Sequence, residues 1–176
     1  MKTLPEKIGL GGGCHWCTEA VFQALRGVGD VAQGFIRASA PDDSWSEAVI
    51  VTFDQSEIDV KTLIDIHLRT HASTSPHKFR GKYRSAIYVF DDKQRNRAEQ
   101  DLQDLQADFE KPLVTQVLTH KGFKPSDVRF QNYYATDPER PFCQTYIDPK
   151  LQLLRTQFAD HAAIQGNDFP RILLRD

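Results

Sequence analysis

GLGGGCHWCTEAVFQAL (residues 9–25) carries three consecutive glycines, a cysteine directly after them and a second cysteine three positions later. The apolar residues before the glycines indicate a strand over residues 7–11. The apolar side chains after the glycines share one face of a helix, and Gly27 is a suitable stop for it. The stretch therefore predicts a strand, a glycine turn and a helix that begins at Cys14.

The chain outward from this stretch alternates strands and helices. Apolar runs over residues 28–36 and 47–53 predict two strands, and the second run is apolar enough for burial on both faces. A helix over 58–68, a turn-rich loop over 71–83 and a strand over 84–90 follow. The resulting order, β-α-β-β-α-β, predicts a two-layer α+β sandwich with a ferredoxin-like core.

The chain beyond residue 90 has weaker patterns. The elements expected there are a charged helix, two strands and a final helix, at residues 94–110, 113–119, 127–131 and 150–160. We expect one domain over residues 1–176, with its core in about 6–132. The segment 133–176 is expected to be irregular and helical, and its last dozen residues to form a tail on the surface.

Length and composition narrow the class of protein. The chain has 176 residues, of which 40% are hydrophobic and 26% charged, as in ordinary globular domains. A net charge of −2 offers no electrostatic attraction for nucleic acid or an anionic membrane. The polar start, MKTLPEKIGL, lacks the apolar segment of a secretory signal. We therefore expect a cytoplasmic protein, in which three cysteines are more often catalytic, metal-bound or inert than disulfide-bonded.

Cys14 has the position of an activated nucleophile. At a helix start, unpaired N–H groups and the helix dipole stabilise a thiolate, so the pKa of Cys14 should fall below the usual value of about 8.5. The glycines at 11–13 let the backbone take positive φ angles and let another molecule come close. Cys17, one helical turn further on, is within possible reach of a disulfide.

The Cys-x-x-Cys spacing leaves three alternatives open. The two cysteines can be small buried hydrophobes. They can be half of a zinc site with His15 or a distant histidine, although no second Cys-x-x-Cys is present. They can also form a thioredoxin-like dithiol, in which case the protein is a dithiol–disulfide oxidoreductase that uses Cys14 and Cys17.

Three motifs in sequence order resemble one enzyme family. GGGCHWCTEAVFQALRGV resembles the GCFWC-x-E-x-x-F signature of the type A peptide methionine-S-sulfoxide reductases. SEAVIVTFD resembles the family's strand with an essential glutamate, and GKYRSAIYVF resembles a GTQYRSAIY-type segment. The likeness covers about residues 8–92 and thins beyond them. The chain is thus identified as a divergent member of this family.

The resemblance implies a reaction and the residues that perform it. Cys14 would attack the sulfur of methionine sulfoxide, Glu47 would protonate the departing oxygen, and the Tyr83 hydroxyl would hold that oxygen. Cys14 would become a sulfenic acid, and a second thiol would condense with it to a disulfide. Thioredoxin, or dithiothreitol in its place, would reduce the disulfide without a metal or organic cofactor. The substrates would be oxidised proteins or free methionine sulfoxide, as in protein repair under oxidative stress.

Two of these roles also follow from the residue types. Alternation along its strand places Glu47 on an apolar face, where desolvation favours a protonated carboxyl that can donate a proton. The alternative for Glu47 is a solvated side chain at the start of a strand. Trp16 belongs either to the core or to an apolar wall that holds the substrate methyl group, and its place beside Cys14 favours the wall.

Three positions depart from the family pattern. His15 replaces the usual Phe, so a histidine would complete the methyl-binding wall, lower the pKa of the nucleophile or act as an acid. Phe35 stands where an oxygen-binding tyrosine is expected, and Ala72 replaces an aspartate. Losing one donor to a developing charge can cost about two to three orders of magnitude in rate. A weakened sulfoxide-binding or redox-sensing relative is therefore a further alternative. His71 and His77 could replace the lost groups, but both are expected at the surface.

The second thiol is either Cys17 or Cys143. Two sulfurs one helical turn apart bridge only with strain, which argues against Cys17. PFCQTYI resembles the family's HQxYL segment beside the active site, so Cys143 could attack a sulfenic acid on Cys14. Cys143 is preferred, and its alternative is an inert buried residue. We expect Tyr134 and Tyr146 to line the same pocket.

Overall fold

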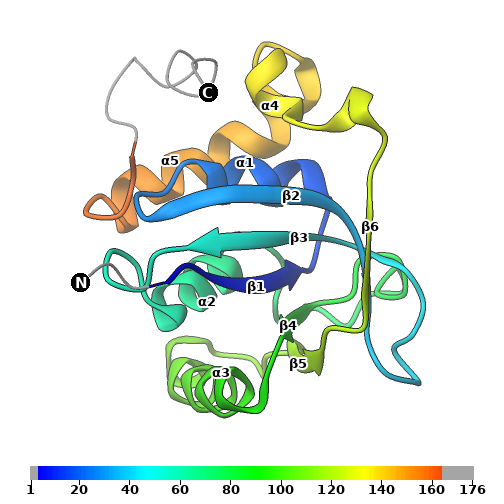
Figure 1. Ribbon diagram of the computed structural model, residues 1–176. Helices are drawn as coiled ribbons and strands as arrows, with labels where there is room; N and C mark the ends of the chain where they lie inside the picture. The colour runs from blue at the N-terminus through cyan, green and yellow to red at the C-terminus, as the bar shows by residue number, and fades with distance from the viewer. Residues whose placement is uncertain (1–3, 164–176) are drawn as a thin grey trace.

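A six-stranded sheet forms the centre of the structure, a computed structural model that describes residues 4–163 (Figure 1). Its strands are β1 (Glu6–Gly11), β2 (Val28–Arg37), β3 (Ser46–Phe53), β4 (Ala86–Val89), β5 (Gln116–Thr119) and β6 (Gly122–Pro125). They lie in the order β5-β4-β1-β3-β2-β6, and only β4 and β5 pair in parallel. The central part, β4-β1-β3-β2, confirms the predicted ferredoxin-like core.

The helices pack on this sheet and on one another. They are α1 (His15–Gln23), α2 (Val60–Arg69), α3 (Asp92–Leu105), α4 (Tyr133–Thr136) and α5 (Asp148–Gln157), with a π-helical turn, η3 (Cys143–Ile147), before α5. The last helix, α5, runs beside α1, and α3 packs on α2, β4 and β5 (Figure 1). None of the described helices is long and apolar enough to cross a membrane.

The main core lies between the sheet and the helices α1 and α2. The apolar spacing that predicts α1 puts Phe22 and Val21 in this core, where neither is exposed. Val49 and Val51 of β3 face them from the sheet and are also completely buried. The other face of the sheet carries a smaller cluster around Ile36. Both faces of β3 are therefore covered, as its nearly continuous apolar run predicts.

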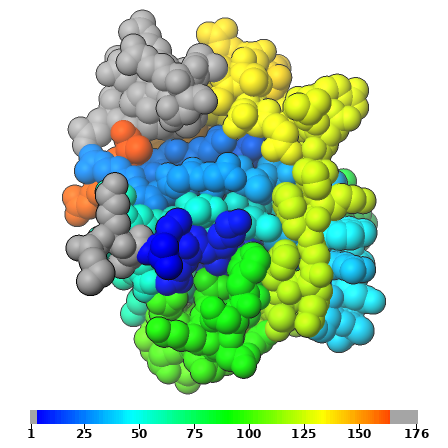
Figure 2. Space-filling model, in the orientation of Figure 1, coloured from blue at the N-terminus to red at the C-terminus, as the bar shows by residue number. Residues whose placement is uncertain are grey.

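The second half of the chain differs from the prediction in three places. Residues 127–131 contain a 3-10 turn, η2 (Val128–Phe130), because the Asp127 carboxylate accepts a hydrogen bond from the Arg129 N–H (2.9 Å) and turns the chain. The edge strand is β6 instead, within a segment that Figure 2 shows as a yellow-green band along one side of the molecule. The helix predicted over 94–110 ends at Leu105. The expected surface tail lies, from residue 164 on, outside the described residues.

Candidate active site

Cys14 lies at the junction of β1 and α1. Its backbone is extended (φ −60°, ψ 127°), and its carbonyl oxygen accepts the first helical hydrogen bonds, from the N–H groups of Cys17 (3.1 Å) and Thr18 (3.3 Å). Its partly exposed side chain therefore stands at the positive end of the helix dipole, as predicted.

Gly11 and Gly12 are required by close contacts within the protein. Among the described glycines, only Gly27 has a positive φ (85°), so residues 11–13 do not use the positive φ that glycine permits. A Cβ atom on Gly12 would lie 2.4 Å from Cδ2 of His71, and one on Gly11 would lie 2.9 Å from the Glu47 carbonyl oxygen. The turn needs glycine because a histidine ring and β3 approach its backbone.

The thiols of Cys14 and Cys17 are coupled by a hydrogen bond. The Cys17 thiol donates to Cys14, and this bond is the main cause that lowers the pKa of Cys14, with help from the N–H groups of Trp16 and Cys17. Burial of Cys14 and the nearby Glu47 act in the opposite direction. The same bond, together with burial, raises the pKa of Cys17. When the pair carries a negative charge, this bond favours the charge on Cys14 and the proton on Cys17.

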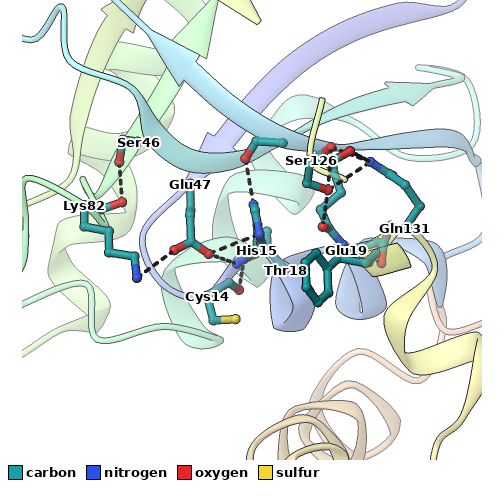
Figure 3. Close-up of polar contacts among 12 residues, drawn as sticks. Cys14, His15, Thr18, Glu19, Ser46, Glu47, Lys82, Ser126 and Gln131 are labelled. Carbon is teal, nitrogen blue, oxygen red and sulfur yellow. Dashed lines mark hydrogen bonds and ion pairs between the residues drawn. The ribbon is translucent and has the colours of Figure 1, made fainter. Parts of the chain in front are cut away.

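Glu47 and His15 face each other next to Cys14 (Figure 3). Glu47 is buried at the start of β3, so the alternative of a solvated side chain is wrong. Its Oε1 atom accepts a hydrogen bond from the backbone N–H of His15 (3.3 Å) and lies 3.3 Å from Nε2 of the His15 ring. Burial lowers the pKa of His15, while a hydrogen bond with the Gly34 carbonyl and the charge of Glu47 oppose this effect.

Lys82 approaches the other oxygen of Glu47, and Tyr83 lies beside Lys82. The Lys82 Nζ atom lies 3.7 Å from Oε2 of Glu47 (Figure 3). A hydrogen bond with the Tyr83 hydroxyl is the main cause that raises the pKa of Lys82, followed by the charges of Tyr83 and Glu47. The sequence analysis used Tyr83 of this segment and assigned no role to Lys82. The lysine is 65% exposed, so this ion pair contributes little to stability but places a cation beside the carboxyl group.

Arg80 holds the loop before β4 against the glycine turn. Its guanidinium donates hydrogen bonds to four carbonyl oxygens, those of Gly12 (2.7 Å), Ser75 (2.9 Å), Tyr83 (3.0 Å) and Ala72. The sequence analysis missed this residue. All four partners are backbone atoms, so no spacing of side chains signals the contact.

Trp16 joins a cluster of aromatic rings from the C-terminal part of the chain. Its ring stacks on Tyr133 (4.2 Å between centroids) and packs against Phe130 (5.3 Å) and Phe142 (5.4 Å). The indole Nε1 atom is buried and has no hydrogen-bond partner among the described residues. Trp16 is only half-buried, so it presents apolar surface beside the nucleophile.

Glu19 fastens the C-terminal segment to α1. Its buried carboxylate accepts hydrogen bonds from the backbone N–H groups of Asn132 (3.0 Å) and Tyr133 (3.1 Å) and from the Gln33 amide (2.9 Å). Burial raises the pKa of Glu19, and these three hydrogen bonds oppose the shift. Glu19 has no role in the sequence analysis, since its two backbone partners lie more than a hundred positions away.

The remaining candidates of the C-terminal segment have different environments. Cys143 is completely buried, its thiol lies 3.6 Å from the Asp137 carbonyl oxygen, and burial raises its pKa. Tyr134 is buried and donates its hydroxyl proton to Asp148 (2.7 Å). Tyr146 is 56% exposed. All three cysteines are free thiols.

The departures from the family pattern surround the same site. Phe35 packs edge-on against the His15 ring (5.2 Å). His71 is half-buried where an exposed residue was expected: its Nε2 atom lies 2.8 Å from the Ser85 hydroxyl, and burial lowers its pKa well below the usual value. His77 is exposed, as expected. For the zinc alternative, no three His, Cys, Asp or Glu side chains within residues 4–163 are grouped so that they could hold a metal ion.

Comparison with known proteins finds one family. A family model described as peptide methionine sulfoxide reductase matches residues 6–162. The peptide methionine sulfoxide reductase MsrA of Chromobacterium violaceum is 34% identical over 170 residues, which cover 88% of this chain and 97% of that protein.

Solved structures show the same fold. The reduced form of Mxr1 from Saccharomyces cerevisiae superposes with a TM-score of 0.70 at 21% identity, over 81% of this chain and 91% of that chain. Mxr1 in complex with Trx2 gives a TM-score of 0.58 at 20% identity, over 73% of this chain and 84% of that chain.

Proposed function

Because the chain belongs to the peptide methionine sulfoxide reductase family, we propose that it reduces the S-epimer of methionine sulfoxide, peptide-bound or free, to methionine. The observation that carries this proposal is the arrangement of Cys14 and Glu47. A thiol with a lowered pKa stands at a helix start, and a buried carboxyl group lies next to it. A sulfoxide needs both a nucleophile for its sulfur and a proton for its oxygen.

The first half of the reaction transfers the oxygen atom. The Cys14 thiolate attacks the substrate sulfur, and the protonated oxygen then moves to the Cys14 sulfur. The substrate S–O bond and the transient bond between the two sulfurs break, which leaves a sulfenic acid on Cys14. The sulfur of Cys14 loses two electrons and the substrate sulfur gains them, so the substrate becomes methionine. Starting from the thiolate, this half consumes one proton, which Glu47 would supply; its position beside Cys14 and His15 supports this role. The Tyr83 hydroxyl would hold the oxygen.

The apolar part of the substrate would lie against Trp16 and Phe35. Trp16 is fixed by its stacking on Tyr133, and Phe35 is fixed by the His15 ring. Both side chains are half-buried, so each keeps some surface for a methyl group. The Tyr134 hydroxyl is already bonded to Asp148, and Tyr146 is exposed, so we assign neither a direct role in substrate binding.

The second half would regenerate the thiolate. A second thiol attacks the sulfenic sulfur, releases water and forms a disulfide. We assign this role to Cys143, because a disulfide between Cys14 and Cys17 would have to bridge two residues one helical turn apart, which requires strain. The complex of Mxr1 with Trx2 supports a thioredoxin as the reductant of the disulfide, and no prosthetic group is required. A cytoplasmic location stays a prediction.

The proposal is tested by turnover of a resolved sulfoxide. Wild-type protein with dithiothreitol should reduce methionine-S-sulfoxide and leave the R-epimer, and Cys14→Ser should abolish the reaction. After one turnover without reductant, peptide mass mapping should show a Cys14–Cys143 disulfide. No turnover by the wild type, or unchanged turnover by Cys14→Ser, would refute the proposed function. A Cys14–Cys17 disulfide would refute only the role of Cys143.

A second candidate function is that of a general dithiol–disulfide oxidoreductase. The hydrogen bond between the Cys14 and Cys17 thiols at a helix start favours it, because such dithiols exchange with disulfides. Reduction of insulin disulfides that needs Cys17, together with no reduction of sulfoxides, would establish this candidate and refute the first. Binding of a sulfoxide peptide without any reduction would instead indicate a relative that has lost activity.

A further inference from the structure

One of the two ring nitrogens of His15, Nδ1, is protonated in every charge state of the ring. Its Nδ1 atom lies 2.7 Å from the Gly34 carbonyl oxygen. A carbonyl oxygen can only accept a hydrogen bond, so Nδ1 carries a proton whether the ring is neutral or charged. Any change in the charge of His15 therefore takes place at Nε2, the nitrogen that faces Glu47.

One proton is needed between His15 and Glu47. The Nε2 atom lies 3.3 Å from Oε1 of Glu47, and both side chains are buried, with 6% and 9% of their surface exposed. A neutral ring beside a carboxylate would bring two lone pairs together without water to separate them. One proton removes this repulsion, either on the carboxyl group, which then donates to Nε2, or on Nε2, which then donates to the carboxylate.

The charged groups around the pair do not supply this proton but influence where it resides. Lys82 lies 3.7 Å from Oε2 and favours the carboxylate, hence a proton on His15. The Cys14 thiolate favours a positive charge nearby. Tyr83 reaches the pair only through Lys82, and Lys124 of β6 lies over the Phe35 ring (5.4 Å) that packs on His15. Lys82, Cys14, Tyr83 and Lys124 are thus the charged and titratable groups that influence where the proton of the pair resides.

From this geometry we propose that His15 and Glu47 act as one acid that holds a single proton for the sulfoxide oxygen. The inference rests on the proposed reductase function and adds a residue to it, since His15 stands where the family has Phe. The numbers of protons agree, because oxygen transfer from the thiolate consumes one proton and the pair stores one. Glu47 is the group that delivers the proton, and His15 is a positioning residue that keeps it available.

The proposal has a consequence for pH dependence. Two coupled sites lose their last proton as a pair, at a higher pH than either site would alone. The pair therefore remains an acid up to a higher pH than a carboxyl group beside a Phe ring would. His15 thus extends the active range to higher pH, which Phe at this position could not do.

The first test compares the wild type with His15→Phe in single-turnover formation of methionine without a recycling reductant. The rate of the variant should fall at a lower pH than the rate of the wild type, and above that fall the variant should be slower by at least about tenfold, as expected for loss of a general acid. His77→Phe is the matched control, because His77 is exposed and the substitution is the same; its profile should follow the wild type. Parallel profiles of the wild type and His15→Phe would overturn the proposal.

The second test does not depend on activity. Nitrogen NMR of the His15 ring should show Nδ1 protonated at every pH, and Nε2 should lose its proton at a lower pH in Glu47→Gln than in the wild type, because the carboxylate that holds the proton is gone. An equal midpoint in both proteins would overturn the shared proton even if the protein is an active reductase. Absence of turnover by the wild type would instead refute the proposed function, and the NMR comparison would still decide whether the pair exists.

Discussion

The His71 ring lies against the backbone of Gly12 so closely that a Cβ atom on Gly12 would come within 2.4 Å of its Cδ2 atom. The ring cannot easily move away, because its Nε2 atom lies 2.8 Å from the Ser85 hydroxyl and the ring also packs on His67. Gly12→Ala should therefore lower the free energy of unfolding by about 1–3 kcal/mol, the usual cost of overpacking. Urea unfolding measures this change.

The neighbouring glycine is the control for this prediction. A Cβ atom on Gly13 would lie 4.0 Å from its nearest neighbour, and Gly13 has no positive φ. Gly13→Ala should change the free energy of unfolding by less than about 0.5 kcal/mol. Equal losses in both variants would show that the His71 contact does not limit the turn.

His67 should make the protein sensitive to acid. It is completely buried, its Nε2 donates to the Gly11 carbonyl oxygen (2.8 Å), and burial lowers its pKa to about 4. In the unfolded chain, His67 binds a proton near pH 6.5, whereas in the folded protein it does so only near pH 4. The contribution of neutral His67 to the free energy of unfolding is therefore present above pH 6.5 and is lost as the pH falls toward 4. The free energy of unfolding should fall by about 3 kcal/mol, because each unit of pKa difference corresponds to about 1.4 kcal/mol.

The measurement is the slope of unfolding free energy against pH in His67→Gln, which keeps a donor but cannot titrate. In this variant the free energy of unfolding should fall less steeply between pH 6.5 and 4 than in the wild type, whatever its value at neutral pH. His77→Gln, at an exposed position, should keep the slope of the wild type. If His67→Gln also keeps it, another group causes the acid sensitivity.

Cys17 should control the acidity of Cys14. Because its thiol donates the main hydrogen bond that lowers the pKa of Cys14, Cys17→Ala should raise the pKa of Cys14. Cys17→Ser keeps a donor at the same position and should raise it less. The rate of alkylation by iodoacetamide against pH, measured in a Cys143→Ser background, reports the midpoint for Cys14. The prediction fails if the midpoints of the Ala and Ser variants coincide.

Glu19 should determine whether the C-terminal segment stays on α1. Glu19→Ala would leave the buried N–H groups of Asn132 and Tyr133 without their acceptor, which should cost about 3 kcal/mol of unfolding free energy. Limited proteolysis should then cut after residue 132 faster than in the wild type. Glu57→Ala, at an exposed position, is the control and should leave both readouts unchanged. Unchanged cleavage in Glu19→Ala would contradict the assigned role.

The sequence predicts the central sheet and the nucleophile because their signals are local. Strand patterns, the glycine turn and the helix start around Cys14 lie within a few residues of one another. The edge strand β6 was misplaced because a hydrogen bond of Asp127 turns the segment that carries the apolar pattern. Arg80 and Glu19 could not be found, since they bond mainly to backbone atoms, which carry no sequence signal, and the two N–H partners of Glu19 lie more than a hundred positions away. His71 was misplaced because loop composition indicates exposure, whereas its polar atoms are bonded inside the protein.

Arg80 has a consequence for how this protein can evolve. Its guanidinium contacts the loop before β4 and the turn at Gly12 only through carbonyl oxygens, which every amino acid provides. The path of the loop is therefore largely independent of its side chains, and Ala72 fits it as readily as the aspartate of the family pattern. Side chains of this loop can therefore be substituted, and the loop can present different groups to a substrate, without a change in the backbone around Cys14.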